Sequence, residues 1–115
     1  MAEMIQNLAA GQTFFDDDVV ETDVLVQTGQ TLLLGYDIHN TTGADAFLQC
    51  FDAAAVADVT VGTTVPDYVI SAAANEVVQG SFPFGLAFPK GLVIASCTTT
   101  GGNTGAAQDV SLVYA

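Results

Sequence analysis

The sequence has almost no basic residues. Lys90 is the one lysine or arginine in 115 residues, and it stands against 13 aspartates and glutamates, which gives a formal net charge of −12. A nucleic-acid-binding protein needs Lys and Arg to displace the counterions of phosphates, and anionic membrane surfaces attract the same two residues. The charge balance therefore argues against nucleic acid and against an anionic membrane as partners.

Cysteine, proline and tryptophan are also scarce, with two, three and no residues respectively. Small secreted scaffolds that depend on disulfides carry more cysteines, so we expect Cys50 and Cys97 to be reduced and buried; a disulfide between them is the alternative. The N-terminus lacks the basic segment of a signal peptide, and no apolar run is long enough to span a bilayer. We therefore expect a protein that is made and folded in a cytosol.

Charged residues make up only 12% of the chain, whereas 50% of the residues are hydrophobic. This hydrophobic content is too high for a disordered chain, and the length is that of one domain with one modest core. Because few charges are available to cover the surface, some apolar area is expected to face other subunits. We therefore expect a homo-oligomer, most simply a trimer.

After Gly11 the chain consists of short runs of β-forming residues separated by turn residues. The runs expected to form strands are 13–15, 19–27, 31–39, 46–52, 68–71, 77–82, 92–97 and 108–114. Short strands at this spacing, without a long helix, predict an all-β fold. We expect residues 12–115 to form an antiparallel β-sandwich of about eight strands, jelly-roll-like or immunoglobulin-like.

Three local features refine this pattern. Asp16, Asp17 and Asp18 are predicted to form a turn after the first run. Pro83 is predicted to end the strand at 77–82, because proline cannot donate to a ladder. The continuous apolar run at 92–97 predicts a strand that is buried on both faces.

Residues 1–11 are predicted to form an N-terminal arm. Met1, Met4, Ile5 and Leu8 are spaced like one face of a short helix. An isolated helix of this length is only marginally stable in water, so the arm should pack on its own domain or on a neighbour. We take Met4, Ile5 and Leu8 as candidate contacts with a partner.

Segment 82–91 is a second candidate contact. Phe82, Phe84 and Phe88 stand close together in the sequence beside two prolines. They either close one end of the core or form an exposed apolar patch that docks on a partner, since aromatic residues are enriched in interfaces. Lys90 is either a solvated charge or the partner of an acid on another subunit.

No constellation of catalytic residues is visible. His39 is the one histidine, and a serine hydrolase would need it to converge with a serine and an acid. No Gly-x-Ser-x-Gly motif surrounds any of the serines. We therefore expect neither an enzyme nor a cofactor.

The densest group of acids follows the first run. It consists of Asp16, Asp17, Asp18, Glu21 and Asp23. Calcium prefers several carboxylates together with backbone oxygens, but the sequence contains no loop with the spacing of an EF-hand. We expect a diffuse acidic face; a specific metal site and a contact with a basic partner surface are the alternatives.

A series of short motifs runs from Ala46 to the end of the chain. They are Phe51-Asp52-Ala53, the Gly-Thr-Thr-Val-Pro-Asp segment 62–67, Tyr68-Val69-Ile70, the aromatic segment 82–92, the small-residue segment 93–98 and Leu112-Val113-Tyr114-Ala115. Their order resembles a family of small virion proteins of tailed phages. The arm and the acidic N-terminal half are not part of this pattern.

The resemblance implies a β-sandwich subunit of a phage particle. It favours a capsid decoration (cement) protein that is made in the host cytoplasm and sits on the capsid surface, where it binds and stabilises the shell of major capsid protein. A tail, head-fibre or baseplate component is the alternative among virion proteins. A lectin-like module that binds carbohydrate or calcium is the alternative from a different class.

Overall fold

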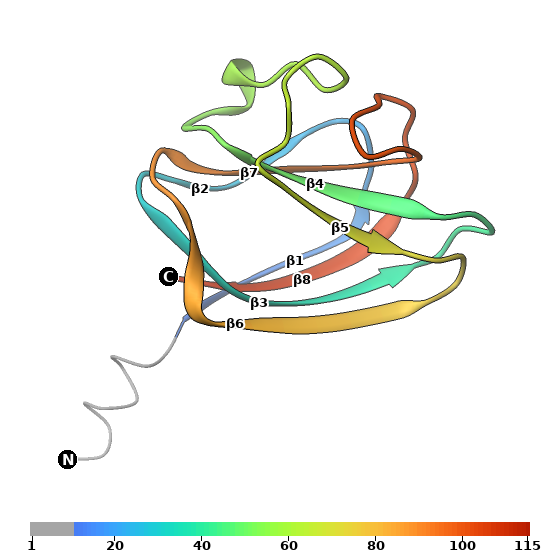
Figure 1. Cartoon of the computed structure of the whole chain (residues 1–115), viewed down its shortest axis with the longest axis horizontal. Helices are drawn as coiled ribbons and strands as arrows, with labels where there is room; N and C mark the ends of the chain where they lie inside the picture. The colour runs from blue at the N-terminus through green and yellow to red at the C-terminus, as the bar shows by residue number, and fades with distance from the viewer. Residues whose placement is uncertain (1–10) are drawn as a thin grey trace.

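Two four-stranded antiparallel sheets pack face to face in the computed structural model, which describes residues 11–115 (Figure 1). The strands are β1 (Gln12–Val19), β2 (Val24–Thr28), β3 (Thr31–Asn40), β4 (Ala46–Asp52), β5 (Tyr68–Ala72), β6 (Val77–Phe88), β7 (Gly91–Cys97) and β8 (Gln108–Tyr114). One short 3-10 helix, η1 (Val56–Asp58), lies between β4 and β5. The predicted all-β sandwich of eight strands is confirmed.

The strand order is that of a jelly roll. Sheet A has the order β1-β8-β3-β6 and sheet B the order β2-β7-β4-β5. The pairs β1·β8, β2·β7, β3·β6 and β4·β5 are all antiparallel, so the chain forms one long two-stranded ribbon that is rolled around the core. This pairing selects the jelly roll over the immunoglobulin arrangement.

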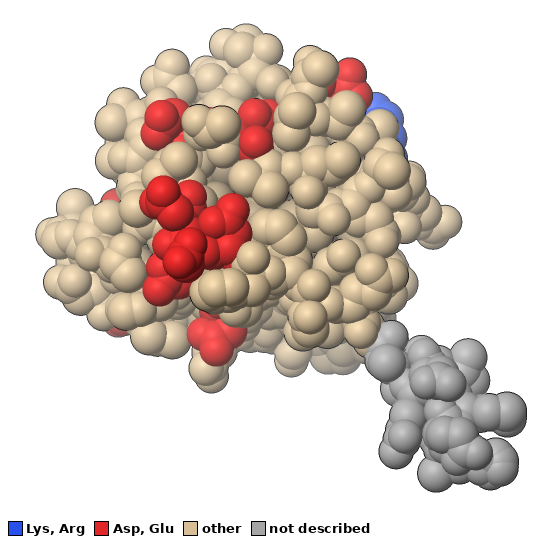
Figure 2. All heavy atoms as spheres, turned by 180° about the vertical axis from the view of Figure 1, so that it is seen from behind, with Lys and Arg blue, Asp and Glu red and all other residues tan. Residues whose placement is uncertain are grey.

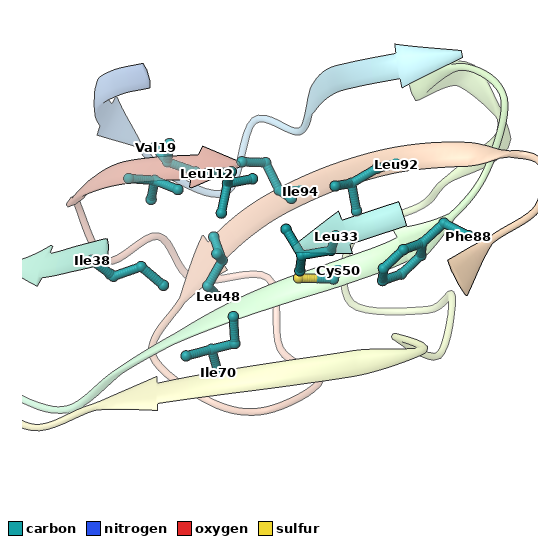
Figure 3. Packing of buried hydrophobic residues seen from close by; sticks show 11 residues of the cluster. Val19, Leu33, Ile38, Leu48, Cys50, Ile70, Phe88, Leu92, Ile94 and Leu112 are labelled. Carbon is teal, nitrogen blue, oxygen red and sulfur yellow. The ribbon is translucent and has the colours of Figure 1, made fainter. Parts of the chain in front are cut away.

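Large apolar side chains from both sheets fill the space between them (Figure 3). Leu33 and Ile38 of sheet A and Leu48 and Ile94 of sheet B are fully buried there. The side chains of a strand alternate between its two faces, so the residues between them point away from this core. In sheet A these residues are mostly polar or small, which is why one face of that sheet is in contact with solvent.

In sheet B, by contrast, the central strands β4 and β7 are buried on both faces. All seven residues of β7 are buried, as the apolar run at 92–97 predicted. Phe51, Val93 and Ala95 form a second, smaller cluster with residues of the loop 53–67. The loop 98–107 closes the same face, where the Gln49 side-chain amide donates to the carbonyl of Gly102 at 3.0 Å. Figure 1 shows both loops above sheet B.

The predicted turn at Asp16, Asp17 and Asp18 was wrong, because β1 runs through these residues to Val19. The pairing with β8 changes register between Asp16 and Val19, where β1 holds one residue more than its partner. The backbone N–H of Asp18 donates to the Asp16 carboxylate at 2.9 Å. A β-bulge therefore absorbs the aspartates. The single strand predicted at 19–27 is in turn divided between β1 and β2, which belong to different sheets.

Pro83 does not end its strand. β6 continues from Val77 to Phe88 because it is an edge strand of sheet A, where a missing N–H need not face a neighbour. Gly35 pairs with Ser81 and Leu33 with Leu86, so residues 82–85 stand opposite the single residue between them in β3. This bulge of four residues explains how the strand accommodates both Pro83 and the left-handed Gly85, whose φ is 77°.

Candidate interaction surface

The outer faces of the two sheets differ in how far they are covered. On sheet B the outward residues Phe51 and Val93 are 1% and 0% exposed beneath the two loops. On sheet A, Phe15 and Val113 are 66% and 40% exposed. Phe14 packs against the core, so its neighbour Phe15 faces outward. On sheet B, the outward Leu25 of the edge strand β2 is 38% exposed, so only its margin is open. Within residues 11–115, the outer face of sheet A is therefore the less covered of the two.

A shallow groove with a volume of about 630 Å³ crosses this face. Its lining includes Thr13, Phe15, Gly35, Asp37, Gln79, Ser81, Ser111 and Val113, which come from all four strands. The central positions Gly35, Ser81 and Ser111 carry small side chains or none. The surface is consequently hollowed at the middle of the sheet, and the ring of Phe15 on the edge strand β1 forms one side of the hollow.

Polar side chains occupy the other part of the face. The Gln79 side-chain amide donates to the Asp37 carboxylate at 3.2 Å within the groove. Further along, His39 and Asp109 are register partners, and the His39 Nδ1 atom lies 3.8 Å from the Asp109 carboxylate. Their side chains are 47% and 38% exposed, and an exposed pair of this kind contributes less than about 1 kcal/mol. No hydrogen bond in the described part of the chain joins His39 to a serine or a cysteine.

The three phenylalanines of segment 82–91 do not form one patch. Phe88 is 1% exposed and belongs to the core, so it is removed from the candidate contacts. The ring of Phe82 packs at 6.0 Å from that of Tyr36 and at 5.6 Å from that of Tyr68, and closes the gap between the sheet edges. Phe84, at the bulge of β6, is 95% exposed. It alone of the three presents its whole side chain to solvent.

Lys90 is exposed in the turn before β7. Its backbone N–H donates to the Asp52 carboxylate at 2.8 Å, while its ammonium group makes no ion pair with any acid in residues 11–115. Met4, Ile5 and Leu8 lie outside the described residues.

Three motifs behind the phage resemblance meet at one end of sheet B. The Asp67 carboxylate accepts from the backbone N–H of Asp52 at 2.7 Å. The N–H of Ala53 donates to the carbonyl of Gly91 at 3.1 Å. These contacts give Asp52 and Asp67 a structural role, because they hold the base of the loop 53–67 against β4 and β7.

The acids form a face rather than a metal site. No three His, Cys, Asp or Glu side chains of residues 11–115 are placed to hold a metal ion. One carboxylate oxygen of Asp23 is buried without a hydrogen-bond partner in the described structure, although the residue is only partly buried. Figure 2 shows carboxylates gathered on one side of the molecule, with others scattered singly.

Both cysteines are free and buried, as expected for reduced thiols. Cys50 pairs with Ile94 and Cys97 with Phe47, so the two thiols are not opposite one another in the β4·β7 ladder. Burial, with a smaller effect from the Asp67 carboxylate, raises the pKa of Cys50 to about 12. Burial and the charge of Glu21 also raise the pKa of Cys97. Neither thiol is poised to be a nucleophile, since the thiolate is the reactive form.

Sequence reasoning did not select Phe15 and Val113, although a signal for them existed. Thr13 and Phe15 occupy alternate positions in β1, as do Ser111 and Val113 in β8. The alternation becomes informative only when β1 and β8 are known to be neighbours, because the groove is made by residues from both strands.

No family model, curated protein or solved structure matches this chain. Among residues 11–115, no helix combines the length and the hydropathy needed to cross a membrane. The similarity to phage virion proteins therefore depends on the quoted motifs, and the function has to be inferred from the surface itself.

Proposed function

We propose that the protein is a virion structural protein, namely a capsid decoration protein that acts by binding alone. The observation that carries this proposal is the open outer face of sheet A, where Phe15 and Val113 border an uncovered groove. Exposed apolar surface of this kind is typical of a site for another protein. Jelly rolls occur in viral capsid proteins and also in lectins and cupins, so the fold supports the proposal by analogy only.

The mechanism would be the burial of surface between neighbouring capsid subunits. A standard interface buries roughly 800 Å² on each partner, which is a modest part of the 6010 Å² exposed by this chain. Three copies around a local axis would each use one surface as donor and another as acceptor, which closes a ring. The partners are further copies of the chain and the major capsid protein.

Charge would set the orientation on the shell. The described residues offer carboxylates over one side and the single ammonium of Lys90, which has no acidic partner among them. The acidic side would point outward or meet a basic capsid surface. Lys90 would pair with an acid of a neighbouring subunit.

Capsid co-sedimentation tests the proposal. Particles assembled from the major capsid protein of the same genome would be mixed with wild-type protein and with the variants Phe15→Ser and Val113→Ser. We expect each variant to bind at least tenfold more weakly. Val65→Ser is the matched control, because Val65 is 81% exposed in the loop over sheet B. Full occupancy by the groove variants would contradict the role of this face.

The copy number per virion separates a decoration protein from a tail, head-fibre or baseplate component. Quantitative mass spectrometry of purified particles should give hundreds of copies for a capsid position. A few copies per particle would favour the tail or baseplate instead.

A carbohydrate-binding module is the second candidate function, and one observation favours it. The groove places the Asp37 and Gln79 side chains, joined by a hydrogen bond, on the same face as the Phe15 ring. A glycan array tests this candidate directly. Binding that Asp37→Ala abolishes would support it, and an array without binding would remove it.

A further inference from the structure

The groove on sheet A begins where the described chain begins. A Cβ atom on Gly11 would lie 2.8 Å from the Val113 side chain and 2.9 Å from the carbonyl oxygen of Tyr114. A glycine is therefore required where the chain passes close to β8. Val113 also lines the groove, so Gly11, the first described residue, lies beside one end of it.

The chain does not turn back toward the groove of its own subunit at this point. Gln12 already pairs with Tyr114 in the β1·β8 ladder. Gly11 is not among the glycines with a positive φ, so it makes no left-handed reversal. The described chain therefore runs from Gly11 straight into β1 and makes no reversal toward the groove at this point.

The composition of this segment suits an apolar groove. Residues 1–10 contain Met1, Met4, Ile5 and Leu8 and a single charge, that of Glu3. The groove presents Phe15 and Val113 above a floor of small side chains. Its volume of about 630 Å³ falls within the range of roughly 300–1,000 Å³ that is common for ligand-binding clefts.

We propose that residues 1–10 of one copy dock in the sheet A groove of a neighbouring copy. Met4, Ile5 and Leu8 pack against Phe15 and Val113 of that neighbour. Because the donating and accepting surfaces differ, the contact is heterologous, and copies related by a closing rotation form a ring such as a trimer. The inference rests on the self-association proposed above and does not depend on attachment to a capsid.

Cysteine cross-linking between two distinguishable chains tests this arrangement. The native thiols of Cys50 and Cys97 are buried and have raised pKa values, so they should stay unreactive during brief mild oxidation at neutral pH. The variants Leu8→Cys and Ser111→Cys would be made as chains of different mass and mixed before oxidation. We expect a disulfide-linked pair that contains one chain of each kind.

The matched control mixes Leu8→Cys with Val65→Cys, since Val65 is exposed over the other sheet. Cross-linking to Val65→Cys as efficient as that to Ser111→Cys would overturn the assigned groove. The double variant Leu8→Cys/Ser111→Cys tests whether the arm docks in the groove of its own subunit. If its thiols close within one chain while the mixture gives no pair, the arm occupies the groove of its own subunit and the proposal is wrong.

Sedimentation of the full chain supplies an independent readout. Ile5→Asp and Phe15→Ser should each weaken self-association at least tenfold, whereas Val65→Ser, at an exposed position over the other sheet, should leave it unchanged. Equal association of all three variants would overturn the inference. If the protein binds capsids but gives no cross-link, only the proposed arm contact is wrong. If it cross-links but does not bind capsids, only the proposed capsid attachment is wrong.

Discussion

The carboxylate of Asp67 accepts a hydrogen bond from the backbone N–H of Asp52 at 2.7 Å. In the same place, the backbone N–H of Asp67 donates to the carbonyl of Cys50 at 2.9 Å. These two contacts join the end of the loop 53–67 to the strand from which the loop departs. The loop is thereby closed at its base, which lets it cover the outer face of sheet B.

Replacement of Asp67 by Ala should destabilise the fold. The substitution removes an ionised acceptor from the N–H of Asp52, and hydrogen bonds to charged groups contribute about 1.5–3 kcal/mol. Because the contact is exposed to solvent, we expect a loss near the low end, about 1.5 kcal/mol, in urea-induced unfolding. Asp58→Ala is the control, since the Asp58 side chain makes no hydrogen bond to another residue in 11–115. Equal stability of the two variants would contradict the structural role of Asp67.

Gly85→Ala should destabilise the bulge of β6. Gly85 has a φ of 77°, and a Cβ atom there would lie 3.2 Å from the Leu32 side chain. The left-handed conformation alone costs about 1–2 kcal/mol for a residue with a side chain. Gly43→Ala is the matched control, because nothing lies within 4 Å of its Cβ position and its φ is not positive. An unfolding midpoint that is the same for both variants would show that the bulge tolerates a side chain.

Alternation and turn residues predicted most strands, because each strand carries its own signal. The double burial of β7 was also predictable, since residues 92–97 are all apolar or small. Pro83 was misjudged because its tolerance depends on β6 being an edge strand, and strand order is a property of the whole sheet. The bulge at Asp16 likewise depends on the register with β8.

The candidate site was harder to predict than the fold. Phe82, Phe84 and Phe88 are close in sequence, yet the bulge of β6 sends one into solvent and keeps another in the core. The groove combines Phe15 with Val113, which are far apart in sequence and become neighbours only when β1 pairs with β8. Local sequence patterns do not reveal that β1 and β8 are paired.

Alkaline pH should destabilise the protein through Cys50. The folded-state pKa of about 12 lies above the ordinary value of 9.0 for a cysteine thiol, so the folded state keeps a proton that the unfolded state loses. This stability is fully present below pH 9 and is lost as the pH rises toward 12, at about 1.4 kcal/mol per pH unit. Urea unfolding at pH 8 and pH 10 measures the loss.

The variant Cys50→Ala separates this thiol from the other groups that titrate. It should be less stable at pH 8, because it leaves a small cavity, but its stability should fall less between pH 8 and pH 10 than that of the wild type. Cys97→Ala keeps Cys50 and serves as the control, with the pH dependence of Cys50 intact. A pH dependence unchanged in Cys50→Ala would show that this thiol does not cause the loss.

Moderate salt should stabilise the isolated subunit. The chain has 13 acids and one base, and three of the acids are consecutive in β1, so carboxylate repulsion opposes the folded state at neutral pH. Raising the ionic strength from 0.01 M to 0.15 M shortens the Debye length from about 30 Å to about 8 Å. If screening weakens the carboxylate repulsion by about 1 kcal/mol, the Tm should rise by roughly 4 °C for a domain of this size.

Asp17→Asn tests the origin of this effect, because Asp17 stands between two other aspartates. Its Tm should start higher at low salt and gain less from added salt than that of Asp58→Asn, whose acid stands alone in the sequence. Retention on capsids would be measured over the same salt series. If basic capsid groups hold the acidic face, retention should fall as salt is added while the Tm of the free subunit rises, because screening weakens the attachment and also the repulsion within the subunit. A wild-type Tm that falls steadily with salt would show that attraction, and not repulsion, dominates among the charges of the free subunit.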